Sequence, residues 1–131
     1  MIWLKTKKDN MATLTPTLTL VSTDTASDSL SVSVTDSLTV TPPSENASRT
    51  SIATGSAQAL IDSNSAFQYI YIKNESGENA TDFLQVKLGG NALIRLDVGE
   101  FCYMPLYNGH AVTAEAYGGA CVVEYGYWTK G

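Results

Sequence analysis

The chain has 131 residues, a formal net charge of −5 at pH 7 and a 44% share of hydrophobic residues. This length supports one hydrophobic core and hardly a second, and the acidic balance argues against nucleic acid as a partner. No run of eighteen apolar residues occurs, and the first ten residues lack the apolar middle of a signal peptide, so we expect neither a membrane partner nor secretion.

The N-terminal part differs in composition from the rest of the chain. We interpret residues 1–11, with Trp3 and three lysines, as an N-terminal extension. Residues 12–48 contain no aromatic side chain and alternate Thr and Ser with Leu and Val. This period of two predicts half-buried strands in an extended Thr/Ser-rich N-terminal β-arm. The alternatives are disorder, or an arm that becomes ordered only against another subunit.

The C-terminal part, residues 49–131, contains every Tyr and Phe and one of the two Trp residues. Strand-like runs at 67–73, 84–88, 92–96, 101–107 and 120–128 are separated by Gly and Asn turns. Strands at this spacing are typical of an all-β protein. We therefore predict an antiparallel β-sandwich of jelly-roll type, with a single short helical turn as the alternative structure at 55–61.

Residues suited to catalysis are sparse. The chain has one histidine, His110, and two cysteines, Cys102 and Cys121, which we expect to be free thiols. A triad of His110, Cys102 and Glu124 is the enzymatic alternative. No metal-ligand spacing and no phosphate-binding loop are present. We expect no catalytic, cofactor-binding or metal-binding residue, and we expect that the protein is not an enzyme.

Surface contact is the function that remains. Tyr and Trp side chains crowd the last thirty residues, and such side chains are enriched at protein interfaces. The alternative is an ordinary hydrophobic core with its rim. The residues predicted for the interface are Leu14, Leu18, Leu20, Leu30, Val32, Tyr107, His110, Tyr125, Tyr127 and Trp128.

Four stretches, at 11–15, 69–74, 99–106 and 123–128, resemble a family of small virion structural proteins of tailed bacteriophages. They read MATLT, YIYIKN, GEF followed by MPL, and VEYGYW. The resemblance implies a β-sandwich that oligomerises on the virion around a three-fold axis. Residues before Met11 are not part of the shared pattern.

The resemblance implies a non-enzymatic capsid decoration or cement protein, a homotrimer that contacts the major capsid protein or other virion proteins. Such a protein is assembled in the host cytoplasm and lies on the outer capsid surface, which suits an acidic chain. A tail, adaptor or fibre-base component is the alternative within the virion. A carbohydrate- or receptor-binding module is the alternative outside it, and it should have a shallow aromatic pocket near residues 107–110.

Overall fold

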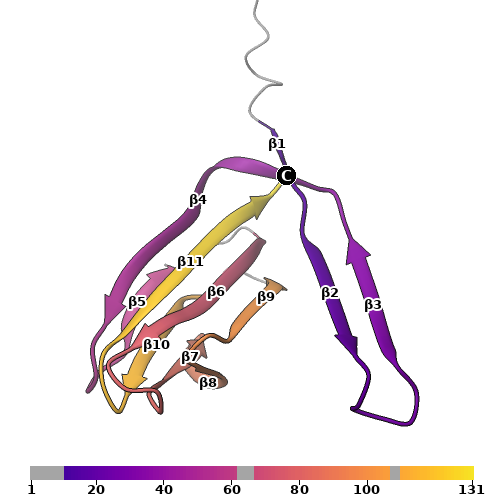
Figure 1. Cartoon of the computed structure of the whole chain (residues 1–131). Coiled ribbons are helices and arrows are strands. Elements are labelled where there is room, and N and C mark those ends of the chain that lie inside the picture. The colour runs from indigo at the N-terminus through magenta and orange to yellow at the C-terminus, as the bar shows by residue number, and fades with distance from the viewer. Residues whose placement is uncertain (1–10, 62–66, 107–109) are drawn as a thin grey trace, which may run out of the picture. The chain divides into compact units, whose positions relative to one another are not determined.

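The computed structural model describes residues 11–61, 67–106 and 110–131, with the side chains of 42–46 left out. Every regular element in this part of the chain is a strand, and the paired strands form antiparallel sheets (Figure 1). The predicted all-β class is therefore confirmed. Within the described ranges, no helix has the length and hydrophobicity needed to cross a bilayer.

The described chain forms two compact units, which divide between Pro42 and Pro43, and Gly131 belongs to the first unit. The sequence predicted a boundary at 48/49, which lies inside a single strand, β4 (Leu38–Ile52). In the first unit, β1 (Ala12–Leu14) pairs with the beginning of β4. In the same unit, β2 (Thr17–Ser22) and β3 (Leu30–Thr35) form a separate two-stranded sheet (Figure 1). We call this sheet the ribbon.

The second unit contains the rest of β4 and seven further strands. These are β5 (Gln58–Ile61), β6 (Gln68–Gly77), β7 (Phe83–Leu88), β8 (Asn91–Asp97), β9 (Phe101–Leu106), β10 (Val112–Tyr117) and β11 (Cys121–Lys130). All five predicted strand runs of the C-terminal part thus correspond to strands. The predicted Asn108-Gly109 turn and Tyr107 lie outside the described residues.

The helical turn considered at 55–61 is wrong. Gln58–Ile61 is strand β5, which pairs antiparallel with β10. Leu60 and Ile61 are both buried, so this short segment gains its stability from core contacts and strand pairing. Neither gain is visible in the local sequence pattern.

Strands of the second unit pair symmetrically about the turn between β7 and β8. β7 pairs with β8, β6 with β9, and β5 with β10, while β4 neighbours β11. The resulting sheets have the orders β1-β4-β11-β6-β9 and β5-β10-β7-β8. This part of the chain is therefore one long antiparallel hairpin whose successive strand pairs alternate between two sheets.

One hydrophobic core joins the two sheets of the second unit. Alternate residues of β6 and β11, such as Ile70, Ile72 and Val123, are fully buried, as are Leu84 and Val86 of β7. Each buried residue is followed by a half-buried one, which is the alternation expected of a sheet with one face on the core.

A buried Asp side chain lies against three glycines at the loop end of the core. Asp82 is 1% exposed, and its Oδ2 accepts a hydrogen bond of 2.8 Å from the backbone N–H of Asn79. A Cβ atom added at Gly77, Gly118 or Gly119 would come closer than 3.0 Å to the Asp82 side chain. Gly118 also has φ of +94°, a conformation that favours glycine. The Gly118-Gly119 pair is therefore required both for the turn and for the close approach of Asp82.

Candidate assembly surfaces

The two faces of the ribbon differ in chemistry because its register is unbroken. Leu18 lies opposite Val34, and Leu20 lies opposite Val32. Residues directly opposite on antiparallel strands project to the same face. The apolar face therefore consists of Leu18, Leu20, Ser22, Leu30, Val32 and Val34, and the hydroxyl face consists of Thr17, Thr19, Val21, Ser31, Ser33 and Thr35.

The apolar face is uncovered in the single chain. Its Leu and Val side chains are between 38% and 55% exposed. A two-stranded hairpin without a covering layer is marginally stable at best in water. The ribbon thus presents a continuous apolar surface that a partner would stabilise by removing it from water.

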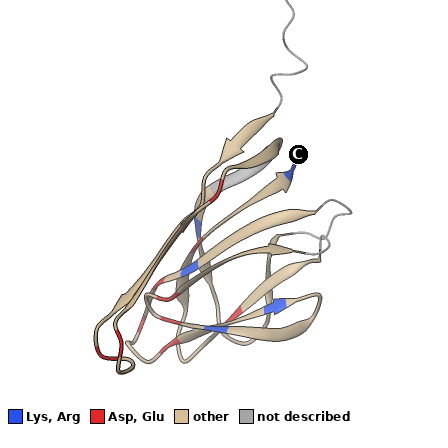
Figure 2. Ribbon diagram, turned by 90° about the vertical axis from the view of Figure 1, so that its right-hand side faces the viewer, with Lys and Arg blue, Asp and Glu red and all other residues tan. Residues whose placement is uncertain are grey.

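The edges of the ribbon are equally unprotected. Neither outer edge pairs with another strand among the described residues. β2 and β3 contain no charged residue and no proline, and their register shows no bulge. Figure 2 shows acidic colour at the loop of the hairpin, where Asp24 and Asp28 lie, and none along its strands. Natural edge strands normally carry charged residues, prolines or bulges, which prevent pairing with other chains. The strands of this ribbon lack all three, so the ribbon is suited to strand addition.

A second surface lies on the five-stranded sheet, on the side away from the core. Tyr69 and Tyr71 of β6 alternate with buried Ile70, so they project to the outer face. Tyr103 of β9 lies opposite Tyr71 and stacks on Tyr69, with 6.4 Å between ring centroids. The Lys130 Nζ lies 5.1 Å from the Tyr69 centroid. Together these side chains form an aromatic outer face.

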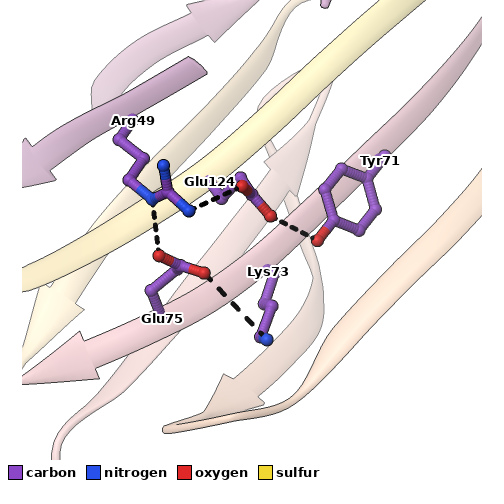
Figure 3. A network of polar contacts seen from close by, with 5 residues as sticks. All are labelled: Arg49, Tyr71, Lys73, Glu75 and Glu124. Carbon is purple, nitrogen blue, oxygen red and sulfur yellow. Dashed lines mark hydrogen bonds and ion pairs between the residues drawn. The ribbon is translucent and has the colours of Figure 1, made fainter. Parts of the chain in front are cut away.

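A charged network adjoins this aromatic outer face (Figure 3). Arg49 Nε donates a hydrogen bond of 2.6 Å to Glu75, and Arg49 Nη2 lies 3.1 Å from Glu124 Oε2. Tyr71 Oη donates a hydrogen bond of 2.8 Å to Glu124 Oε1, and Lys73 Nζ lies 4.0 Å from Glu75. The network therefore ties together β4, β6 and β11.

The network changes how its members bind protons. The hydrogen bond from Arg49 lowers the pKa of Glu75 below its usual value. Burial raises the pKa of Tyr71 to about 12, and the hydrogen bond to anionic Glu124 adds to the increase. Because Arg49 is 62% exposed, water screens these ion pairs, and the network orients surface side chains more than it stabilises the fold.

The predicted interface residues fall in several environments. Leu18, Leu20, Leu30 and Val32 lie together on the apolar face of the ribbon. Leu14 is half-buried in β1, opposite Leu38.

The predicted aromatic residues of β11 lie on both sides of the sheet. Tyr125 and Tyr127 are half-buried and pack against the core, so only part of each ring is available to a partner. Trp128 lies opposite Tyr69, on the outer face. His110 is exposed, and Tyr107 is outside the described residues.

Two features of these surfaces were missed by the sequence interpretation. Val34 completes the apolar face, and its alternation with Val32 was already a usable signal. The network of Arg49, Glu75 and Glu124 joins strands that are distant in the chain, so no local signal could have identified it.

Two residues of the triad considered in the sequence lie on opposite faces of one sheet. Cys102 lies opposite Ile72 and packs against the core, whereas Glu124 lies on the outer face of the same sheet. The proposed triad of His110, Cys102 and Glu124 is therefore not assembled. Both cysteines are free, and burial raises the pKa of each thiol. Where side chains are described, no three His, Cys, Asp or Glu residues form a group that could hold a metal ion.

Comparison with known proteins gives no relative. The chain has no significant match among protein-family models, curated proteins or solved structures. The ribbon, the aromatic outer face and the fold are therefore the features that bear on function.

Proposed function

We propose that this chain is a non-enzymatic structural protein of a tailed-phage virion, a decoration or cement protein that stabilises the shell through contacts between subunits. The observation that carries this proposal is the uncovered apolar face of the ribbon. A structural protein that works by association needs such a surface, because apolar area removed from water drives most protein association. Its partners are further copies of itself, as a homotrimer, and the major capsid protein or other virion proteins.

The proposed fold is an antiparallel β-sandwich of the jelly-roll type with an N-terminal β-arm. The mirror pairing of β4 to β11, in two four-stranded groups that share one core, supports the jelly roll. Viral capsid domains commonly use this architecture. The arm corresponds to the ribbon and the flanking pair of β1 with β4, and the separation of the chain into two compact units supports it.

A place on the outer capsid surface fits the charge. The net charge of −5 disfavours contact with packaged nucleic acid, whose phosphates would repel the protein. A ribbon with free edges can lie across a seam between shell subunits, or add its strands to a neighbouring sheet. A tail, adaptor or fibre-base position would use the same contacts, and it stays the alternative within the virion.

A glycan-binding module is the second candidate function. The aromatic outer face favours it, because Tyr69 and Tyr103 offer stacked rings, with the Lys130 ammonium group 5.1 Å from the Tyr69 ring and Tyr71 opposite Tyr103. Sugar rings stack on aromatic faces. Polar groups beside the rings donate hydrogen bonds to the sugar hydroxyls or accept hydrogen bonds from them. The ribbon has no role in this alternative.

The position in the virion is tested by immunogold labelling and mass spectrometry of gradient-purified particles from the cells that produce the chain. Label distributed over the shell supports the decoration protein, and label at the tail or its base selects the alternative position. Particles without the chain contradict the proposal. A glycan array probed with the purified protein tests the second candidate separately.

A further inference from the structure

We infer that the ribbons of three copies close into a six-stranded antiparallel β-barrel around a three-fold axis, with the apolar faces inside. The inference rests on the proposed self-association and specifies its geometry. It follows from three properties of the ribbon: the uncovered apolar face, the unprotected edges, and the absence of charge in both strands.

A partner of the ribbon must cover its apolar face and pair with its edges. Burying only the apolar face would leave two edges of unpaired N–H and C=O groups, and pairing only the edges would leave Leu and Val side chains in water. A closed ring of identical ribbons satisfies both requirements at once, because a barrel has no edges and one enclosed face. The occupant of the surface is thus the same ribbon in further copies of this chain.

Strand direction also favours a ring of identical ribbons. Rotation about an axis that runs along the strands keeps every ribbon pointing the same way. β3 of one copy then lies beside β2 of the next copy, and these strands run in opposite directions, as β2 and β3 do within one ribbon. The contact between copies therefore repeats the antiparallel pairing already present inside each copy, and the repeated contact closes into a ring.

The number of copies is that of the proposed homotrimer, and three ribbons give a ring of six strands. About eight strands enclose an interior just wide enough for large side chains, so the interior of a six-stranded ring is narrower and suits small side chains. Two ribbons would give only four strands and a still narrower ring, and each copy beyond three would cost translational and rotational entropy. The interior would be filled by Leu and Val, which are smaller than the aromatic residues absent from this region.

The chemistry of the ends agrees with this arrangement. Asp24 and Asp28 lie in the loop between the strands, and Asp36 follows β3. No charge therefore enters the barrel. Ser22 is the one polar residue that would face inward, and its hydroxyl donates a hydrogen bond of 3.0 Å to Asp24 at the loop end. The outer surface would be formed by the hydroxyl face, which can hydrogen-bond to water.

The test combines solution mass with amide hydrogen exchange measured by NMR on the full chain. A ring of three copies has a mass of about 42 kDa, three times 14.0 kDa. In an isolated antiparallel pair, every second residue directs its N–H group away from its partner strand. The barrel predicts slow exchange at all amides of β2 and β3, because the outward groups pair with the next copy.

The outcomes separate this inference from the proposed function. A trimer in which every second amide of β2 and β3 exchanges as fast as a loop amide overturns the barrel and leaves self-association intact. A dimer has the same consequence. A monomer at all concentrations overturns both the barrel and the self-association on which it rests.

Discussion

Leu20 and Val32 lie directly opposite each other in the ribbon, and their side chains are 47% and 38% exposed. Their neighbours Thr19 and Ser33 also form an opposed pair, on the hydroxyl face. These two pairs are neighbours along the same strands. One pair contributes to the apolar face of the ribbon and the other to the hydroxyl face. This arrangement provides a matched test of which face is buried in the proposed assembly.

The double variant Leu20→Glu with Val32→Glu should lose self-association. Each copy would place two carboxylates in the apolar contact, and burying an unpaired charge costs several kcal/mol. The association constant should fall by more than about 100-fold, since each 1.4 kcal/mol corresponds to a factor of ten. Sedimentation velocity measures the change. The control Thr19→Glu with Ser33→Glu adds the same charges to the hydroxyl face and should keep the oligomer, whereas equal loss in both variants would count against a buried apolar face.

Gly118→Ala should destabilise the second unit far more than Gly99→Ala. Both glycines have positive φ, +94° and +92°, so each substitution costs about 1 kcal/mol in backbone strain. Only at Gly118 would the new methyl group meet the buried Asp82 carboxylate, and displacing it should cost about 2 kcal/mol more. Urea denaturation measures both losses. Similar values for the two variants would show that Asp82 does not depend on this close approach.

Arg49→Met should raise the pKa of Glu75 toward 4.5, because the variant lacks the guanidinium that donates to this carboxylate. The folded chain holds the pKa of Glu75 below its unfolded value, so the interaction stabilises the protein above pH 4.5 and is lost as pH falls through the lower, folded pKa. The difference in stability between wild type and variant should therefore shrink in acid. NMR titration of the Glu75 carboxyl carbon tests the shift. Arg95→Met, which removes the ion pair with Asp97 in the other sheet, should leave the Glu75 titration unchanged.

Tyr71→Phe should change the response of stability to alkaline pH. The unfolded chain loses the Tyr71 proton near its usual pKa of 10.0, whereas the folded chain keeps it to about 12. The folded state therefore binds more protons between these values, and the wild type loses stability there as pH rises. At pH 7 the variant should be less stable by about 1 kcal/mol through loss of the hydrogen bond to Glu124. This difference should narrow above about pH 10 in a series of denaturation curves, and parallel curves would contradict the assignment.

Local patterns predicted the parts of the fold that depend on local chemistry. Alternation of Thr and Ser with Leu and Val over residues 12–48 predicted strands, and β2 and β3 lie in this range, because period two decides which side chains share a side. The predicted half-burial is wrong, since nearly every residue of β2 and β3 is exposed in the single chain. Paired glycines marked the ends of β7 and β10, since Gly89, Gly90 and Gly118 all adopt positive φ. The sequence did not predict strand β5 and offered a helical turn at 55–61 instead. Strand β5 is stabilised by pairing with β10, which is about fifty residues away in the chain.

Features that depend on strand order could not be predicted from the sequence. Arg49, Glu75 and Glu124 meet only because β4 and β6 both neighbour β11. The half-buried position of Tyr125 and Tyr127, in contrast, could have been predicted from the sequence. Both share the parity of buried Val123, which places them on the side of β11 that packs against the core.

Association through the ribbon is tested most directly by the mass of the purified full chain, measured by light scattering over a range of concentrations. The account predicts a stable species of about 42 kDa, three times 14.0 kDa, that persists on dilution. A folded species of 14.0 kDa at every concentration would contradict it, because the apolar face of the ribbon would then be stable in water without a partner.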